Sequence, residues 1–251
     1  MINLLRSEVL KFRTVRLHVW LTIGAVGLLL VVVGLVGMLS SEPRRTRPDD
    51  LMSLIGGFSV LIAMTVGVLA ALGITSEFSH NTIRPTLAAT PQRTTVFVAK
   101  AVLSTVYGLV VGAVAVVAAY LLGSLLLSAR GASVGLSGDD GSLAAFLGVP
   151  ILCALLALFG YGLGLLLRNS PAAVSLIILW PLLLESILNG VLSVAGVDEP
   201  TRLLPYTSAF ALVIPNPSDA PGGRIYGGVY FGMFALLITV IGIAVNNRRD
   251  A

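Results

Sequence analysis

Long apolar stretches recur along the chain, separated by short polar segments. Six stretches hold about 20 or more predominantly apolar residues, the length that an α-helix needs to cross a bilayer core of roughly 30 Å. They are residues 18–39, 51–74, 97–127, 143–167, 172–194 and 225–245. The alternation of period two that is typical of membrane barrels is absent, and lipid requires every backbone group to be paired internally. The pattern predicts an all-α integral membrane protein with six transmembrane helices, forming one transmembrane domain over residues 1–251.

The composition restricts the class of protein further. Of the 251 residues, 56% are hydrophobic and only 11% are charged, whereas a typical soluble domain has about 25% charged residues. This excludes an ordinary soluble enzyme, which could not cover its surface with polar groups. The formal net charge of +4 would suggest a nucleic-acid partner for a soluble protein. In a membrane protein it instead concerns orientation, and no nucleic-acid partner is expected.

The basic residues favour one orientation. With a cytoplasmic N-terminus, the inner segments hold ten Lys and Arg against three acidic residues, and the outer segments hold six against eight. Because Lys and Arg concentrate in cytoplasmic loops, we expect both termini in the cytoplasm. Residues 1–16 carry a net positive charge, and within them the apolar residues Ile2, Leu5, Val9 and Phe12 recur at helical spacing. This predicts an amphipathic helix on the inner leaflet; the alternative is a positive flank that only fixes the topology.

Neither a nucleotide-hydrolysing motif nor a metal site is expected in this chain. Its two lysines, Lys11 and Lys100, do not follow a glycine, so the phosphate-loop pattern G-x-x-x-x-G-K-[ST] is missing. Its two histidines, His18 and His80, are far apart and have no cysteine or carboxylate cluster nearby. We therefore expect no catalytic residue and no cofactor in the chain itself.

Glu185 is the only acidic residue well inside a predicted span. A charge in the membrane is costly and usually faces the bundle interior. Two interpretations remain open: a pathway or gating residue, or a structural acid that is hydrogen-bonded to another helix. Pro181, one turn earlier, lacks a backbone N–H and predicts a local irregularity of the helix.

Small residues at spacings of three or four form stripes on two predicted spans. They are Gly108, Gly112, Ala115, Ala119 and Gly123 in the third span, and Gly160 and Gly164 in the fourth. Such stripes let helices approach closely, so we interpret them as packing surfaces rather than as a substrate lining. Between the last two spans, residues 195–224 contain five prolines and an apolar run, 208–214, that is too short to span. This predicts an extracellular or re-entrant helical cap, with an unstructured loop as the alternative.

The predicted cytoplasmic segment 75–95 is the most informative loop. Between positions 73 and 100 the chain reads G-I-T-S-E-F, then N-T-I-R-P-T-L, then T-P-Q-R and finally A-K. Its mixed polar and apolar composition favours a short surface helix over a solvated connector, which is the alternative. The pattern resembles the cytoplasmic loop of ABC-2 (type-2 ABC transporter) permeases, in particular the small stand-alone permeases of bacterial exporters. The six spans and the N-terminal interfacial helix agree with this resemblance.

The resemblance implies that this segment contains a coupling helix that docks on a separate ATPase subunit. The residues that it makes candidates for this contact are Glu77, Phe78, Thr82, Ile83, Arg84, Leu87, Pro91 and Arg93. Ile83 and Leu87 would supply apolar anchors, whereas Arg84 and Arg93 would reach carboxylates, or alternatively lipid phosphates.

By the same resemblance, the chain is the permease subunit of an ATP-driven exporter in a bacterial inner membrane. Two copies, or this chain and a homologous permease, would form the pathway, and the ATPase partner would bind ATP and Mg²⁺. Membrane lipids are the remaining partners. Within the same class, an immunity or sensor permease that removes peptides from the membrane is an alternative. A non-ABC ion-coupled carrier or membrane scaffold is another alternative. A carrier should bury several charges in its spans, and because Glu185 is the one clear example in the sequence, this interpretation is weaker.

Overall fold

The computed structural model describes residues 16–43, 46–80, 82, 93–132, 134–215 and 222–249. In this part of the chain the secondary structure is helical and no β-strand occurs. The predicted interfacial helix lies outside the described residues, apart from Arg16, where the first described helix begins.

Six helical stretches are long and apolar enough to cross a membrane. Five of them are single helices: α2 (Arg16–Leu39), α3 (Pro48–Ser79), α5 (Arg93–Ala129), α6 (Ser142–Leu167) and α10 (Gly223–Arg249). The remaining stretch joins α7 (Ser170–Leu179), the π-helical turn η2 (Trp180–Leu184) and α8 (Glu185–Val194). These helices confirm the prediction of an all-α, multi-span membrane protein.

Helices α3 and α5 extend beyond the apolar stretches that predict them. They contain 32 and 37 residues, which at 1.5 Å per residue gives lengths of about 48 and 56 Å, well above the hydrocarbon core. The sequence after Ile74 is polar, yet it stays helical, and the hydroxyls of Thr75 and Ser76 are paired within the helix with carbonyls of the preceding turn. The connection between α3 and α5 is therefore residues 80–92 rather than 75–95.

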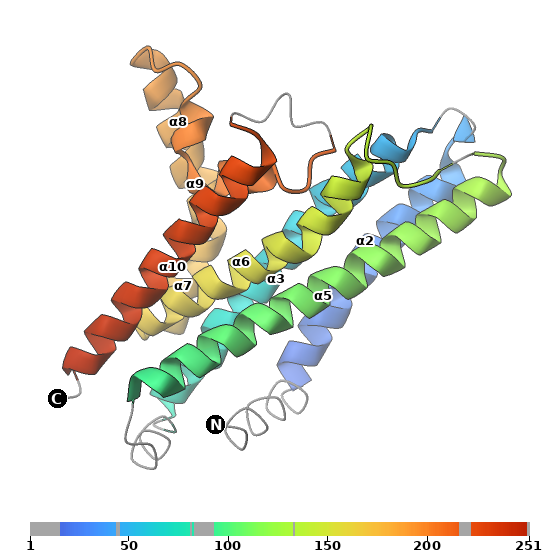
Figure 1. Cartoon of the computed structure of the whole chain (residues 1–251). Coiled ribbons are helices and arrows are strands. Elements are labelled where there is room, and N and C mark those ends of the chain that lie inside the picture. Colours follow the sequence, from blue (N-terminus) through green and yellow to red (C-terminus); the bar gives the residue numbers. More distant parts are fainter. Residues whose placement is uncertain are drawn as a thin grey trace.

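Helix α6 forms the centre of the bundle and packs against α3, α5 and α10 (Figure 1). A Cβ atom added at Gly160 of α6 would lie 2.0 Å from the Gly67 carbonyl oxygen of α3. One added at Gly108 of α5 would lie 2.5 Å from the Cys153 carbonyl oxygen of α6. No side chain fits at either crossing, so the small residues bring the helix backbones into direct contact.

The irregularity predicted at Pro181 is present as η2, which interrupts the helix between α7 and α8. Proline has no N–H to donate to the carbonyl four residues earlier, that of Ile177. The hydroxyl of Tyr206 donates to this carbonyl instead, at 3.2 Å. A residue from the segment between α8 and α10 therefore pairs the group that Pro181 leaves free.

This segment folds back into the bundle through the 3-10 turn η3 (Pro200–Leu203) and the short helix α9 (Pro205–Phe210). Its backbone lies against glycines of two long helices: a Cβ atom at Gly148 would lie 1.8 Å from the Leu212 oxygen, and one at Gly227 would lie 1.9 Å from the Ser208 oxygen. Tyr206 is fully buried. The backbone of residues 205–213 thus turns back into the packed bundle, and we call these residues the re-entrant segment.

Candidate functional site

The end of the bundle where α3 ends and α5 begins carries the predicted coupling residues that the structure describes, namely Glu77, Phe78, Thr82 and Arg93. Helix α2 begins and α10 ends on the same side (Figure 1). We call it the inner end, since the distribution of basic residues predicts that it faces the cytoplasm.

Glu77 and Lys100 form an ion pair at the inner end. The Lys100 Nζ donates to Glu77 Oε1 at 2.6 Å, and the two residues are only 9% and 5% exposed. Charge-assisted hydrogen bonds of this length are among the stronger ones in proteins. The pair joins the last turn of α3 to the second turn of α5, on either side of residues 80–92.

Arg168, in the link between α6 and α7, connects three further elements. Its guanidinium lies over the ring of Phe78 of α3, with Cζ 4.7 Å from the ring centroid, a distance at which the cation and the ring attract each other. Its Nε donates to Oδ1 of Asn246 of α10 at 2.7 Å. The Asn246 side chain in turn donates to the Leu165 carbonyl. One arginine thus ties α3, α6 and α10 together.

Hydroxyl and amide groups complete this network. Ser170 at the start of α7 donates to Thr75 Oγ1 of α3 at 2.7 Å, and Asn247 of α10 donates to Thr94 Oγ1 of α5 at 3.0 Å. After α3 the chain turns back, with the Thr82 N–H donating to the Glu77 carbonyl at 3.0 Å. The inner ends of α3, α5, α6, α7 and α10 are therefore linked by polar contacts.

Further along the fifth span and well inside it, four hydrogen bonds converge on the buried carboxylate of Glu185, which is 2% exposed. Oε1 accepts from the Tyr206 N–H at 2.7 Å and from the Trp180 indole at 3.2 Å. Oε2 accepts from the N–H and the hydroxyl of Thr207, at 2.8 and 2.7 Å. Glu185 thus pairs the free backbone donors at the start of α9, which a helix cannot pair by itself.

An aromatic cluster surrounds this contact. The Phe159 ring of α6 is within 6.4 Å, centroid to centroid, of Trp180, Tyr206, Phe231 and Phe234. These distances are typical of favourable ring pairs. Sequence reasoning singles out Glu185 but misses Trp180, Tyr206 and Thr207. One feature of the sequence points toward a residue such as Tyr206. Pro181 leaves a backbone carbonyl free, and this carbonyl needs a hydrogen-bond donor from another part of the chain.

Residues 4–179 match the family described as ABC-2 family transporter protein. The chain belongs to the ABC-2 family. The matched part contains α2, α3, α5, α6 and α7, and therefore all of the inner end except that of α10. A search among curated proteins finds no match to the sequence. Membership makes the chain a membrane-spanning permease of an ABC transporter, as the pattern at positions 73–100 predicts.

The structure divides the predicted coupling residues of this ABC-2 permease into two groups. Glu77 and Phe78 lie inside the inner-end network, Thr82 lies in the turn after α3, and Arg93 begins α5. The others lie outside the described residues: Ile83, Arg84, Leu87 and Pro91.

The predicted packing glycines of the ABC-2 permease lie at crossings of α6. Gly108 and Gly112 of α5 face Cys153, and Gly160 and Gly164 of α6 face α3 at Gly67 and Ala71. All four glycines are buried. The two pairs of glycines therefore lie at two different helix crossings within one chain.

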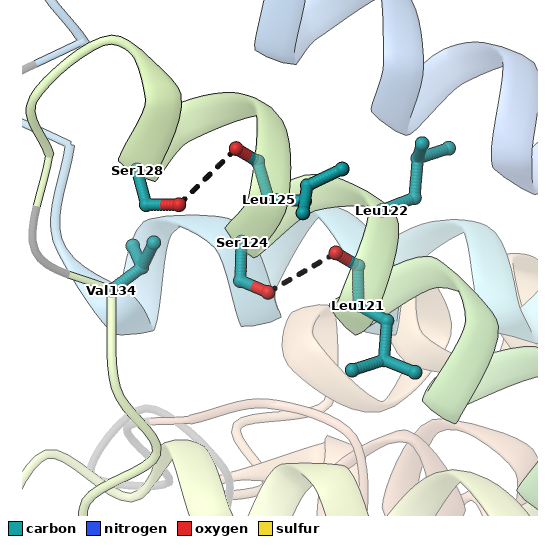
Figure 2. Close-up of a pocket in the computed structure, with 6 residues that line it drawn as sticks. All are labelled: Leu121, Leu122, Ser124, Leu125, Ser128 and Val134. Atoms are coloured by element: carbon teal, nitrogen blue, oxygen red, sulfur yellow. Dashed lines mark hydrogen bonds between the residues drawn. The ribbon is translucent and has the colours of Figure 1, made fainter.

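A groove of about 520 Å³ lies at the C-terminal end of α5 and is lined by six residues (Figure 2). They are Leu121, Leu122, Ser124, Leu125, Ser128 and Val134. Ser124 and Ser128 donate their hydroxyl hydrogens to the Leu121 and Leu125 carbonyls of their own helix. The lining includes no ionisable side chain, so this groove offers apolar contact and little polar recognition.

Proposed function

We propose that this ABC-2 permease is the transmembrane subunit of an ATP-driven exporter in a bacterial plasma membrane. Two copies, or this chain with a homologous permease, would form the substrate pathway, and a separate ATPase subunit would bind at the inner end. The observation that carries the proposal is the family match over residues 4–179, which includes both helices that flank the connection 80–92. In this assembly the ATPase partner binds ATP and Mg²⁺, and the permease contributes no cofactor.

The contacts of the inner end support a role in transmission. Five helices are joined there by the Glu77–Lys100 pair, the Arg168 contacts and the hydrogen bonds that the Ser170 hydroxyl and the Asn247 amide donate. Mechanical coupling needs rigid elements with connected packing, because packed helices shift as units rather than deform continuously. A push on residues 80–92 would therefore reach the bundle through several contacts at once.

We propose a positioning role for Glu185, in place of a proton pathway. Both oxygens of its carboxylate accept hydrogen bonds, four in all, and these bonds hold the start of α9 and the Trp180 indole in place. This arrangement argues against the ion-coupled carrier, whose acid has to bind and release a proton during transport.

Co-purification tests the proposal. The tagged chain is expressed together with candidate ATPase subunits encoded near its gene and extracted in mild detergent. Recovery of an ATPase in a fixed ratio to the permease is expected. Its absence, while the permease remains monodisperse, would contradict the proposed function. Glu185→Gln separates the alternatives, because proton-coupled transport should be abolished whereas ATP-driven turnover should persist.

A further inference from the structure

We infer that Glu77 and Lys100 form a clamp that makes the inner ends of α3 and α5 move as one unit. The inference rests on the proposed function, because the clamp would transmit a push that the ATPase applies to residues 80–92. It assigns Glu77 a role different from that of a docking residue. Glu77 becomes a positioning residue, and Lys100 becomes its partner.

The position of the pair supports a clamp. Glu77 lies two residues before the end of α3, and Lys100 lies seven residues after the start of α5. The ion pair therefore closes a ring of chain that contains the whole connection. Thr82 adds to this closure, since its N–H donates to the Glu77 carbonyl at 3.0 Å. When residues 80–92 are displaced, α3 and α5 should therefore move together, because the ion pair joins them.

The burial of the pair makes the clamp stiff. The side chains of Lys100 and Glu77 are 5% and 11% exposed, so separating them would take two opposite charges apart in a place where water solvates them poorly. An exposed pair would exchange its partner for water at little cost. Behind the clamp, α3 and α5 contact the backbone of α6 through Gly160 and Gly108. Movement of the clamped ends is therefore passed to the central helix.

The same burial argues against direct docking through the Glu77 side chain. A partner protein needs accessible atoms, and little of this carboxylate is accessible. The exposed residues on this turn are Ser76, Ser79 and His80. These residues, and not Glu77, present the end of α3 to a partner.

The test compares single charge reversals with a charge swap. Glu77→Lys and Lys100→Glu each place two like charges together, and the double variant restores an opposite pair in reversed order. Glu77→Gln, which keeps the size of the side chain, is the milder variant if a reversal does not fold. Glu199→Lys is the matched control, because Glu199 pairs with Arg202 in an exposed ion pair remote from the clamp.

The first readout uses the permease alone in nanodiscs. Spin labels at Ser79→Cys and Val98→Cys report the distance between the two inner ends, and native Cys153 stays unlabelled because it is fully buried. We expect one narrow distance distribution for the unaltered chain, the charge swap and the Glu199→Lys control. The single variants should give a distribution at least twice as broad. Equal widths for all of them would overturn the clamp.

The second readout uses the permease with its ATPase. Single variants should bind the ATPase with a Kd within threefold of the unaltered chain, while the permease-stimulated kcat for ATP falls at least tenfold and the swap restores it to within threefold. A Kd raised tenfold and not restored by the swap would show that Glu77 is a docking residue. If the unaltered chain binds no ATPase, the proposed function fails, and the distance measurement still decides on the clamp.

Discussion

Glu185 and Thr207 are joined by two hydrogen bonds to one carboxylate oxygen, at 2.8 Å from the backbone N–H and 2.7 Å from the hydroxyl. The contact links the first residue of α8 to the first turn of α9, 22 positions later in the chain. A carboxylate at the start of a helix also interacts favourably with the helix dipole. Glu185 therefore holds the re-entrant segment in place from inside the membrane span.

Replacing Glu185 with alanine should destabilise the permease. The N–H groups of Tyr206 and Thr207 would stay buried without an acceptor, and each such group costs about 1–3 kcal/mol. We expect a loss of about 2–5 kcal/mol in the free energy of unfolding, measured by denaturant titration in detergent. The control is Glu199→Ala, which removes an exposed ion pair and should cost less than about 1 kcal/mol. Equal effects of the two substitutions would contradict the capping role.

Gly148 and Gly57 should respond differently to alanine. A Cβ atom at Gly148 would lie 1.8 Å from the Leu212 oxygen, whereas one at Gly57 would have no neighbour within 4 Å. Gly148→Ala should displace the re-entrant segment and cost about 1–3 kcal/mol or more. Gly57→Ala should be neutral or stabilise its helix by up to about 1 kcal/mol. Thermal unfolding in one detergent measures both, and a stable Gly148→Ala would show that the segment does not occupy this position.

The ion pair of the inner end should show non-additive energetics. Lys100→Met removes the opposite charge that Glu77 contacts at 2.6 Å in a buried position and should cost about 3–5 kcal/mol. Glu77→Leu combined with Lys100→Met removes both charges and should recover most of this loss, because an apolar pair often replaces a buried ion pair without penalty. A double-mutant cycle of unfolding free energies gives the coupling between the two residues. A coupling near zero would mean that the pair contributes nothing to stability.

Single cysteines should report the orientation of the permease. Gly138→Cys and His80→Cys both lie at exposed positions, at opposite ends of the bundle. Native Cys153 is fully buried and should give no background. A maleimide that cannot cross membranes should label Gly138→Cys in intact spheroplasts and label His80→Cys only after lysis. The reverse pattern would contradict the orientation predicted from the basic residues.

The spans are predictable from sequence because about 20 apolar residues are a physical requirement for crossing the bilayer. The kink at Pro181 is predictable for an equally local reason, the missing N–H. The pairing of Glu77 with Lys100 is not predictable in this way, since it depends on polar residues after Ile74 remaining helical and on where α5 begins. Gly148 and Gly57 look alike in the sequence. Only the path of the re-entrant segment distinguishes a tightly packed glycine from an open one.

We propose that residues 80–92, between α3 and α5, form the ATPase-binding site of this ABC-2 permease. The most direct measurement is the binding of the purified ATPase subunit to the permease in nanodiscs, compared with Ile83→Asp and Leu87→Asp variants. Leu203→Asp, which alters an exposed residue beside α9, is the control. We expect saturable binding to the unaltered chain and the control, and a Kd at least tenfold higher for the two variants. Equal binding to all four proteins, or no binding to the unaltered chain, would contradict the assignment of residues 80–92 as the ATPase-binding site.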